Sequence, residues 1–302
     1  MDLRVYLLAF NLSHPNSHLA FSILIFPKTR SLPSLFNFPD RRIASVSDPD
    51  HRPQRVSMET HLNPLPFFFS IFFTIYIIAY FLLFRNWSPK IRPEAASCAI
   101  SFAHGTPAVI LASKAILADI ARGFASSNTD FQNSVLDYSI AYFLMDLLHY
   151  LIFFPADLLF IAHHLVTLFV FVTCRYLVSY GAYAILVLLI LAEVTSFCQN
   201  AWTLARARRA DVEFADRVYN LLSPPFYVLY SIVRGFVGPY FLYKMGEFFF
   251  NGGAETVIPK WVWMSWIFVV AAAISVSILW ITNLWIELYR ERSTKLEKKK
   301  AR

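Results

Sequence analysis

The sequence predicts an all-α membrane protein in which about seven transmembrane helices form a bundle around an internal, lipid-accessible cavity. Three observations support this prediction. The 302 residues are 57% hydrophobic and 17% aromatic, a composition that excludes an ordinary soluble domain. The apolar residues fall in separate stretches of about 20 residues, the length that a helix needs to cross a bilayer. Ionisable side chains recur inside those stretches at helical spacing, which indicates that they face protein and not lipid.

Seven apolar stretches are expected to form the spans, because transmembrane β-strands are shorter and alternate polar with apolar residues. They cover residues 66–84, 95–116, 135–154, 157–177, 181–204, 218–243 and 261–285. The second stretch is the weakest, because it is interrupted by His104, Gly105, Pro107 and Lys114. The turns around Pro155 and Gly181 are short, so the third to fifth spans are expected to pack as antiparallel neighbours.

The stretches divide the chain into a bundle over residues 65–290, an N-terminal segment over 1–64 and a basic cytosolic tail over 291–302. The N-terminal segment is rich in Ser, Pro, Arg and His. It is interpreted as a disordered tail or a mis-assigned start, with Met58 as the candidate start. An organelle transit peptide is the alternative, and three aspartates in the segment argue against it.

Basic residues are distributed unequally between the two sides of the predicted membrane. The richer side carries Arg85, Lys90, Arg92, Arg206, Arg208, Arg209, Arg217 and the C-terminal run from Arg290. The poorer side carries Arg52, Arg55, Arg122, Arg175, Lys244 and Lys260. The positive-inside rule therefore places the C-terminus in the cytosol. This distribution also accounts for the net charge of +7 without nucleic acid as a partner.

Two basic clusters have more than one reading. Lys299 and Lys300 stand at positions −4 and −3, the pattern of a cytosolic dilysine signal for retrieval to the endoplasmic reticulum, or they form a plain basic flank. Arg206, Arg208 and Arg209 are candidates to attract an anionic cofactor such as coenzyme A or anionic head groups, or they serve as a topological anchor.

Polar residues form one stripe on each of three neighbouring spans, and a fourth span carries an arginine. The stripes, spaced by whole helical turns, comprise Tyr142, Asp146, His149 and Tyr150 on the third span, Asp157, His164 and Thr167 with the adjacent His163 on the fourth, and Glu193, Ser196 and Asn200 on the fifth. A charged group at the bilayer centre costs about 2.5–3.5 kcal/mol. The stripes are therefore expected to converge on a cavity, with Arg234 of the sixth span neutralising Glu193 or Asp146.

Each group has a structural alternative. Asp146 and His149 could form one interhelical hydrogen-bonded pair, and the stripe from Glu193 to Asn200 could be polar contacts between helices. No metal site is expected, because adjacent histidines point about 100° apart on a helix and the three cysteines form no CxxC pair. Imidazole titrates near neutral pH, so His163 and His164 suit proton transfer or acyl capture.

These motifs resemble the TLC-domain family, lipid-handling membrane proteins that include the ceramide synthases. The resemblance covers most of residues 95–288, and its motifs are Asp146-Leu-Leu-His149-Tyr150, Pro155-Ala-Asp157, His163-His164-Leu-Val-Thr167, Glu193 to Asn200, and Arg234 with Pro239. It implies a helical bundle in the endoplasmic reticulum that encloses a chamber open to lipid.

The resemblance also implies roles. In ceramide synthases the adjacent histidines are essential to transferring a fatty acyl group from acyl-CoA to a sphingoid amine. Carried over, His163 and His164 would capture the acyl group or act as general base, and Asp146 would support them. The head group of a bound lipid would be held by His149, Thr167, Glu193, Ser196, Asn200 and Arg234.

One departure favours the small, non-synthase branch of the family, whose members are associated with membrane lipid composition. The synthase signature continues with His-Asp and a further Asp, where this chain has Ala192-Glu193, Ser196 and Asn200. The expected function is lipid homeostasis, with a membrane lipid (an acyl chain or a sphingolipid) as partner and no required cofactor. The alternative is a sphingosine N-acyltransferase with acyl-CoA as substrate. A proton-coupled carrier is a third hypothesis. The sequence shows neither the inverted repeat nor the matched broken helices that are typical of such carriers.

Overall fold

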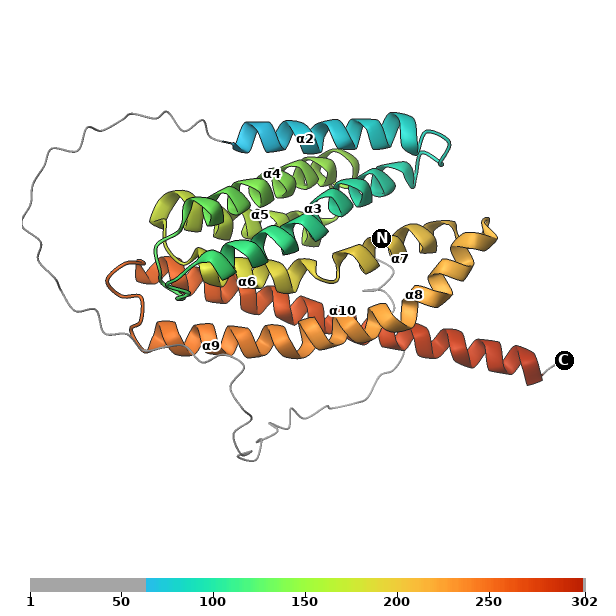
Figure 1. Cartoon of the computed structure of the whole chain (residues 1–302). Coiled ribbons are helices and arrows are strands. Elements are labelled where there is room, and N and C mark those ends of the chain that lie inside the picture. Colours follow the sequence, from blue (N-terminus) through green and yellow to red (C-terminus); the bar gives the residue numbers. More distant parts are fainter. Residues whose placement is uncertain (1–63, 301–302) are drawn as a thin grey trace, which may run out of the picture. The chain divides into compact units, whose positions relative to one another are not determined.

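A computed structural model describes residues 64–300, and across this range it contains helices and no strand (Figure 1). The prediction of an all-α membrane protein is therefore confirmed. The predicted N-terminal tail, apart from Pro64, lies outside the described residues, as do the candidate start Met58 and the last two residues of the chain. The basic segment predicted as a tail continues the last helix as far as Lys300.

Three helices continue into a π-helical turn, and one of these turns, η3, joins α8 directly to α9. In chain order the elements are α2 (Leu65–Ile78), η1 (Ala79–Leu83), α3 (Arg92–Ala118), α4 (Asp130–Phe153), α5 (Leu158–Val172), η2 (Thr173–Val178), α6 (Ala182–Glu193), α7 (Ser196–Arg208), α8 (Glu213–Ile232), η3 (Val233–Val237), α9 (Gly238–Phe250) and α10 (Lys260–Lys300).

Within the described residues, six helical runs are long and apolar enough to cross a membrane. They match six of the seven predicted stretches. The remaining stretch, 218–243, lies in the continuous run α8–η3–α9, where Pro224, Pro225 and Arg234 reduce the hydropathy. Figure 1 shows this orange run returning along the bundle from the end of α7 to the start of α10. The described chain therefore passes seven times between the two ends of the bundle.

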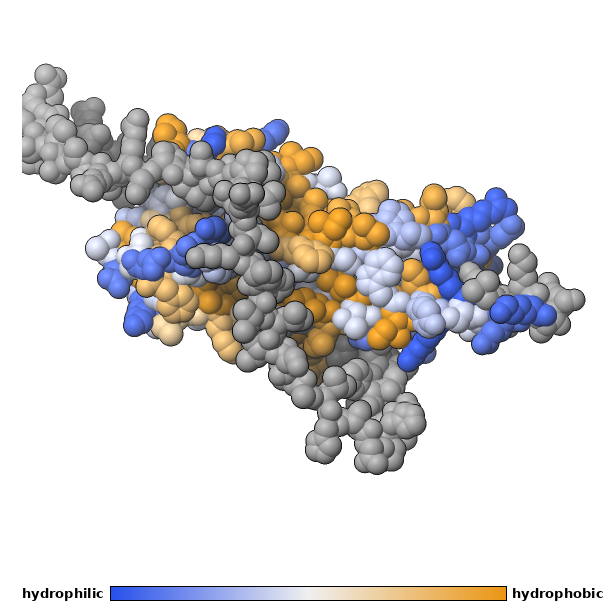
Figure 2. Space-filling model, turned by 90° about the horizontal axis from the view of Figure 1, so that it is seen from below, coloured by the Kyte–Doolittle hydropathy of each residue, from blue (hydrophilic) through white to orange (hydrophobic). Residues whose placement is uncertain are grey.

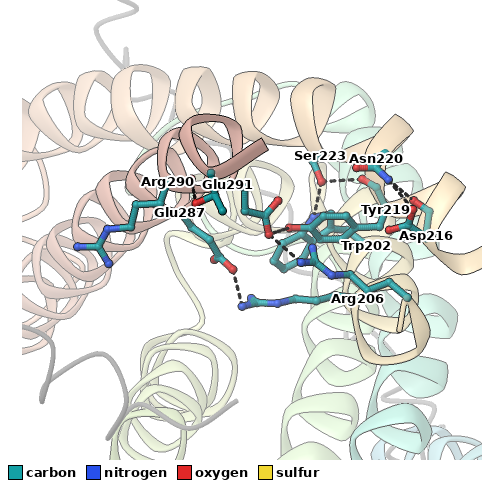
Figure 3. Close-up of polar contacts among 11 residues, drawn as sticks. Trp202, Arg206, Asp216, Tyr219, Asn220, Ser223, Glu287, Arg290 and Glu291 are labelled. Carbon is teal, nitrogen blue, oxygen red and sulfur yellow. Dashed lines mark hydrogen bonds and ion pairs between the residues drawn. The ribbon is translucent and has the colours of Figure 1, made fainter. Parts of the chain in front are cut away.

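The basic residues assigned to the richer side meet at one end of the bundle. The Arg208 guanidinium of α7 lies 4.9 Å from the centre of the Trp87 ring in the α2–α3 loop. This contact brings α7 and the loop together. Arg206 donates to Glu287 of α10 at 2.7 Å (Figure 3). Figure 2 shows hydrophilic residues at both ends with a largely hydrophobic surface between them, as expected of a helical bundle that contacts lipid.

The opposite end is formed by the α3–α4 loop and the turn before α6. The Gly181 N–H donates to the Ser126 carbonyl at 2.9 Å, and the Phe124 ring lies 5.6 Å from that of Phe241 in α9. Gly181 has a φ of +86°, a left-handed conformation that glycine adopts without steric cost. This conformation lets the chain reverse its direction within the few residues between η2 and α6.

The weakest predicted span, α3, lies at the centre of the bundle. Its buried face consists largely of alanines, with Ala96, Ala108 and Ala112 fully buried, and small side chains let neighbouring helices approach closely. Two of the four residues that interrupt its apolar pattern, His104 and Gly105, are buried too. Contact of this face with neighbouring helices explains why α3 needs fewer large apolar side chains than a helix that faces lipid.

The fifth predicted span is confirmed as one of the six helical runs, and its helix is interrupted between α6 and α7. Helix α6 ends at Glu193 and α7 begins at Ser196. Arg234 of η3 donates from Nη2 to the Ala192 carbonyl at 2.6 Å. In an uninterrupted helix that carbonyl would accept from the N–H of residue 196. The arginine thus competes with the helical ladder at the point where the ladder stops.

The alternating passes predict that the α2–α3 loop and the α3–α4 loop lie on opposite sides of the membrane. Lys90 is exposed in the first loop, and Ile120 is 100% exposed in the second. In a background with Cys198→Ser, one of Lys90→Cys and Ile120→Cys should react with an impermeant maleimide in sealed vesicles. The other should react after permeabilisation. Labelling of both cysteines in sealed vesicles would contradict the arrangement.

Candidate functional site

The centre of the candidate site is a carboxylate shared by three helices. Asp146 of α4 is 4% exposed. One of its oxygens accepts from the Ser97 hydroxyl of α3 at 2.7 Å. The other lies 2.8 Å from Nε2 of His164 on α5. The contacts confirm that the polar stripes of the third and fourth spans meet.

The hydrogen bonds of His164 show how many protons the Asp146–His164 pair holds. Its Nδ1 lies 2.7 Å from the Phe160 carbonyl, and a carbonyl only accepts, so Nδ1 carries a hydrogen. One further proton then lies between Nε2 and the Asp146 carboxyl group, bonded to one or the other. Either way the pair has no net charge, which reduces the cost of burying it at membrane depth.

His163 points away from this pair. It is exposed, its ring plane is inclined by 84° to that of His164, and the two ring centres are 5.5 Å apart. Two adjacent helical residues diverge by about 100°, so the buried position of His164 places His163 on the outside of α5. His163 is therefore the imidazole that a molecule in the surrounding lipid can reach.

A second imidazole–carboxylate pair lies between α3 and α6. His104 is fully buried, stacks on the Tyr142 ring with centres 4.0 Å apart and has Nε2 3.2 Å from the Ser139 hydroxyl. Its Nδ1 lies 3.8 Å from Oε1 of Glu193 and has no hydrogen-bond partner among the described residues. Sequence reasoning treated His104 only as an interruption of a span. A histidine next to glycine in an apolar stretch was the signal available.

Gly105 brings α3 against the α6–α7 break. A Cβ at this position would lie 2.9 Å from the Ser196 Cβ and 3.0 Å from Oε2 of Glu193. The same Oε2 accepts the Ser196 hydroxyl at 2.6 Å. Glycine is thus the residue that allows the helix backbone to pack directly on this carboxylate.

Arg234 forms a different contact from the one expected. Asp146 is paired with His164, and among the described ion pairs none joins Arg234 to a carboxylate. The guanidinium donates to the Ala192 carbonyl and lies 5.4 Å from the centre of the Tyr230 ring.

The other predicted residues divide between the site and its surroundings. His149 shares a 2.8 Å hydrogen bond with the Tyr76 hydroxyl of α2, so it does not pair with Asp146. The Asn200 amide donates to the Ser196 carbonyl at 2.9 Å, one turn back along α7. Thr167 is half-buried on α5, one turn beyond the histidines. Asp157 is the residue just before α5, which is the position at the helix start that the sequence predicted.

Comparison with known proteins shows which family this arrangement belongs to. The model of the TLC domain matches residues 67–286, a range that includes every site residue described above. A TLC domain-containing protein of Arabidopsis thaliana is 64% identical over 236 residues, which are 78% of this chain and 93% of the relative. The chain therefore belongs to the TLC family. No solved structure matches it.

The two histidines are expected to differ in their effect on stability. His164→Ala removes the partner of a buried carboxylate, a change that costs about 3–5 kcal/mol of unfolding free energy. His163→Ala alters an exposed side chain and should change it by less than about 1 kcal/mol. Thermal melting followed by fluorescence size-exclusion chromatography in mild detergent measures the difference. Equal melting of the two variants would refute the assigned geometry.

Proposed function

We propose that this protein is a multi-pass membrane protein of the endoplasmic reticulum that binds an acyl lipid in its bundle and serves lipid homeostasis. The observation that carries the proposal is the exposed imidazole of His163 beside the buried Asp146–His164 pair. A polar group on the outer face of a transmembrane helix is costly unless it meets a polar partner. The polar part of a membrane lipid is the partner available at that face.

The depth of His163 suits the polar part of a lipid. It lies five residues after Leu158, the first residue of α5, or about 8 Å along the helix. The surrounding surface of α5 is apolar, with Leu158 72% and Leu165 51% exposed. A lipid lying along α5 would place its chain on these side chains and its polar group near His163.

The proposed location rests on the charge distribution. The end of the bundle that holds the α2–α3 loop and the C-terminal part of α10 carries the richer set of basic residues. By the positive-inside rule this end is cytosolic, so Lys90→Cys would be the cysteine that reacts in sealed microsomes.

The Asp146–His164 pair favours a second candidate, an N-acyltransferase that forms an amide from acyl-CoA and a sphingoid base. A carboxylate that orients an imidazole is a common element of proton transfer in catalysis, and His163 would be the group that touches the substrate. The basic cluster gives this candidate less support. Arg206 contacts Glu287, Arg208 contacts Asp211 and Arg209 contacts Glu291, which favours the anchoring role over binding of coenzyme A.

The lipid-binding proposal predicts that purified full-length protein retains an acyl lipid after extensive washing in mild detergent. His163→Ala should reduce the retained amount several-fold, because the polar contact at the helix surface is lost while the fold remains. Lipid mass spectrometry, normalised to protein, measures the retained species. Thr282→Val, an exposed change on α10, is the control. An empty wild-type bundle, or lipids in bulk membrane proportions, would contradict the proposal.

The acyltransferase candidate makes a separate prediction. Purified protein given mixed acyl-CoAs and sphingoid bases should form amides, and His163→Ala should abolish them with melting behaviour unchanged. Amide formation is followed by mass spectrometry against a heat-treated control. If wild type and variant give equal traces of product, this candidate is removed while lipid binding stands.

A further inference from the structure

The junction between α6 and α7 contains a buried hydroxyl that no protein group satisfies. Thr195 is 0% exposed and occupies the N-cap position of α7. A threonine at this position ordinarily accepts a hydrogen bond from the first turn of its helix. Here the side chain makes no capping bond, and its hydroxyl has no partner among the described residues.

A second unsatisfied donor faces the same junction. Arg234 donates from Nη2 to the Ala192 carbonyl at 2.6 Å, but its Nε is buried without a partner in the described part of the chain. Thr195 follows Ala192 by three residues, and the intervening backbone keeps right-handed helical angles. Residues three apart lie on one helical face, so Thr195 lies on the same side of the junction as Ala192, whose carbonyl the guanidinium contacts.

The nearby carboxylate is already committed to other groups. Glu193 accepts the Ser196 hydroxyl with Oε2 and has Oε1 3.8 Å from Nδ1 of His104. It therefore does not satisfy Thr195 or the Arg234 Nε–H. Its negative charge already balances the positive charge of Arg234 at the junction. A phosphate or a free carboxylate would therefore add an uncompensated buried charge, which is costly at low dielectric.

We propose that the α6–α7 junction binds the carbonyl oxygen of an acyl ester or amide. The Thr195 hydroxyl and the Arg234 Nε–H donate to this oxygen, and the N-terminus of α7 adds a favourable partial positive charge. The Arg234 Nε–H requires an acceptor, and the Thr195 hydroxyl can donate to the same atom. The opposite charges of Arg234 and Glu193 favour a neutral acceptor, and a carbonyl meets these conditions. The inference rests on the proposed function and deepens it, because it predicts selection of ester- and amide-linked lipids over ether-linked ones.

The experiment compares two lipids that differ only in the carbonyl groups. Purified full-length protein is equilibrated with an equimolar mixture of a diacyl phosphatidylcholine and its dialkyl ether analogue of equal chain length, washed, and analysed by mass spectrometry. Wild type should retain the ester over the ether by about fivefold, the ratio that one net hydrogen bond gives. The Thr195→Val variant keeps the side-chain shape and should reduce the ratio to near one.

Two further variants complete the test. Arg234→Lys keeps the charge but removes Nε–H, so it should also lower the ratio, whereas Thr282→Val on exposed α10 should leave it unchanged. Equal retention of both lipids by wild type, or an unchanged ratio in Thr195→Val, overturns the carbonyl site and leaves lipid binding intact. Retention of neither lipid overturns the proposed function and this inference together.

Discussion

The neutral pair of Asp146 and His164 sets the rotation of the helices around it. Neither side chain is tolerable alone at membrane depth, so α4 and α5 must turn toward each other. Ser97 adds α3 to the same carboxylate at 2.7 Å. Because His104 follows Ser97 by seven residues, about two helical turns, the contact also turns His104 and Gly105 inward. The second buried pair with Glu193 is therefore a geometric consequence of the first.

Helical periodicity predicted that the polar stripes of α4 and α5 meet, because residues spaced by whole turns share a face whatever the tertiary structure. It did not predict which of two adjacent histidines points inward, since both lie near the edge of the polar stripe. The break between Glu193 and Ser196 was not predictable either. Its cause is an arginine 42 residues away from Ala192 in sequence, and no local pattern records that contact. His104 was missed because a buried polar residue on a protein-enclosed helix resembles a weak span.

Hydropathy reports contact with lipid and not passage through the membrane. Helix α3 has a lower apolar content than α2 or α10 because neighbouring helices cover one of its faces, and its alanines allow α4 and α6 to approach closely. The run α8–η3–α9 falls outside the candidate spans for a related reason, as it carries Arg234 and a paired set of prolines. Both segments lie where polar chemistry is needed. In this bundle the least hydrophobic segments are the ones that build the site.

The buried polar groups fall into two classes that differ in their hydrogen bonds. Asp146, His164 and Ser97 satisfy one another, and such groups fix a structure. Thr195, the Nε of Arg234 and Nδ1 of His104 are buried at or beside the helix break without partners in the described chain. An unsatisfied buried group costs about 1–3 kcal/mol, and a fold retains three of them only against some compensating gain. A ligand that supplies the missing partners would recover that free energy on binding. The affinity of such a site then comes from the hydrogen-bonding groups that are unsatisfied in the empty protein. Selectivity for a ligand is therefore expected at the helix break and not at the satisfied Asp146–His164 pair.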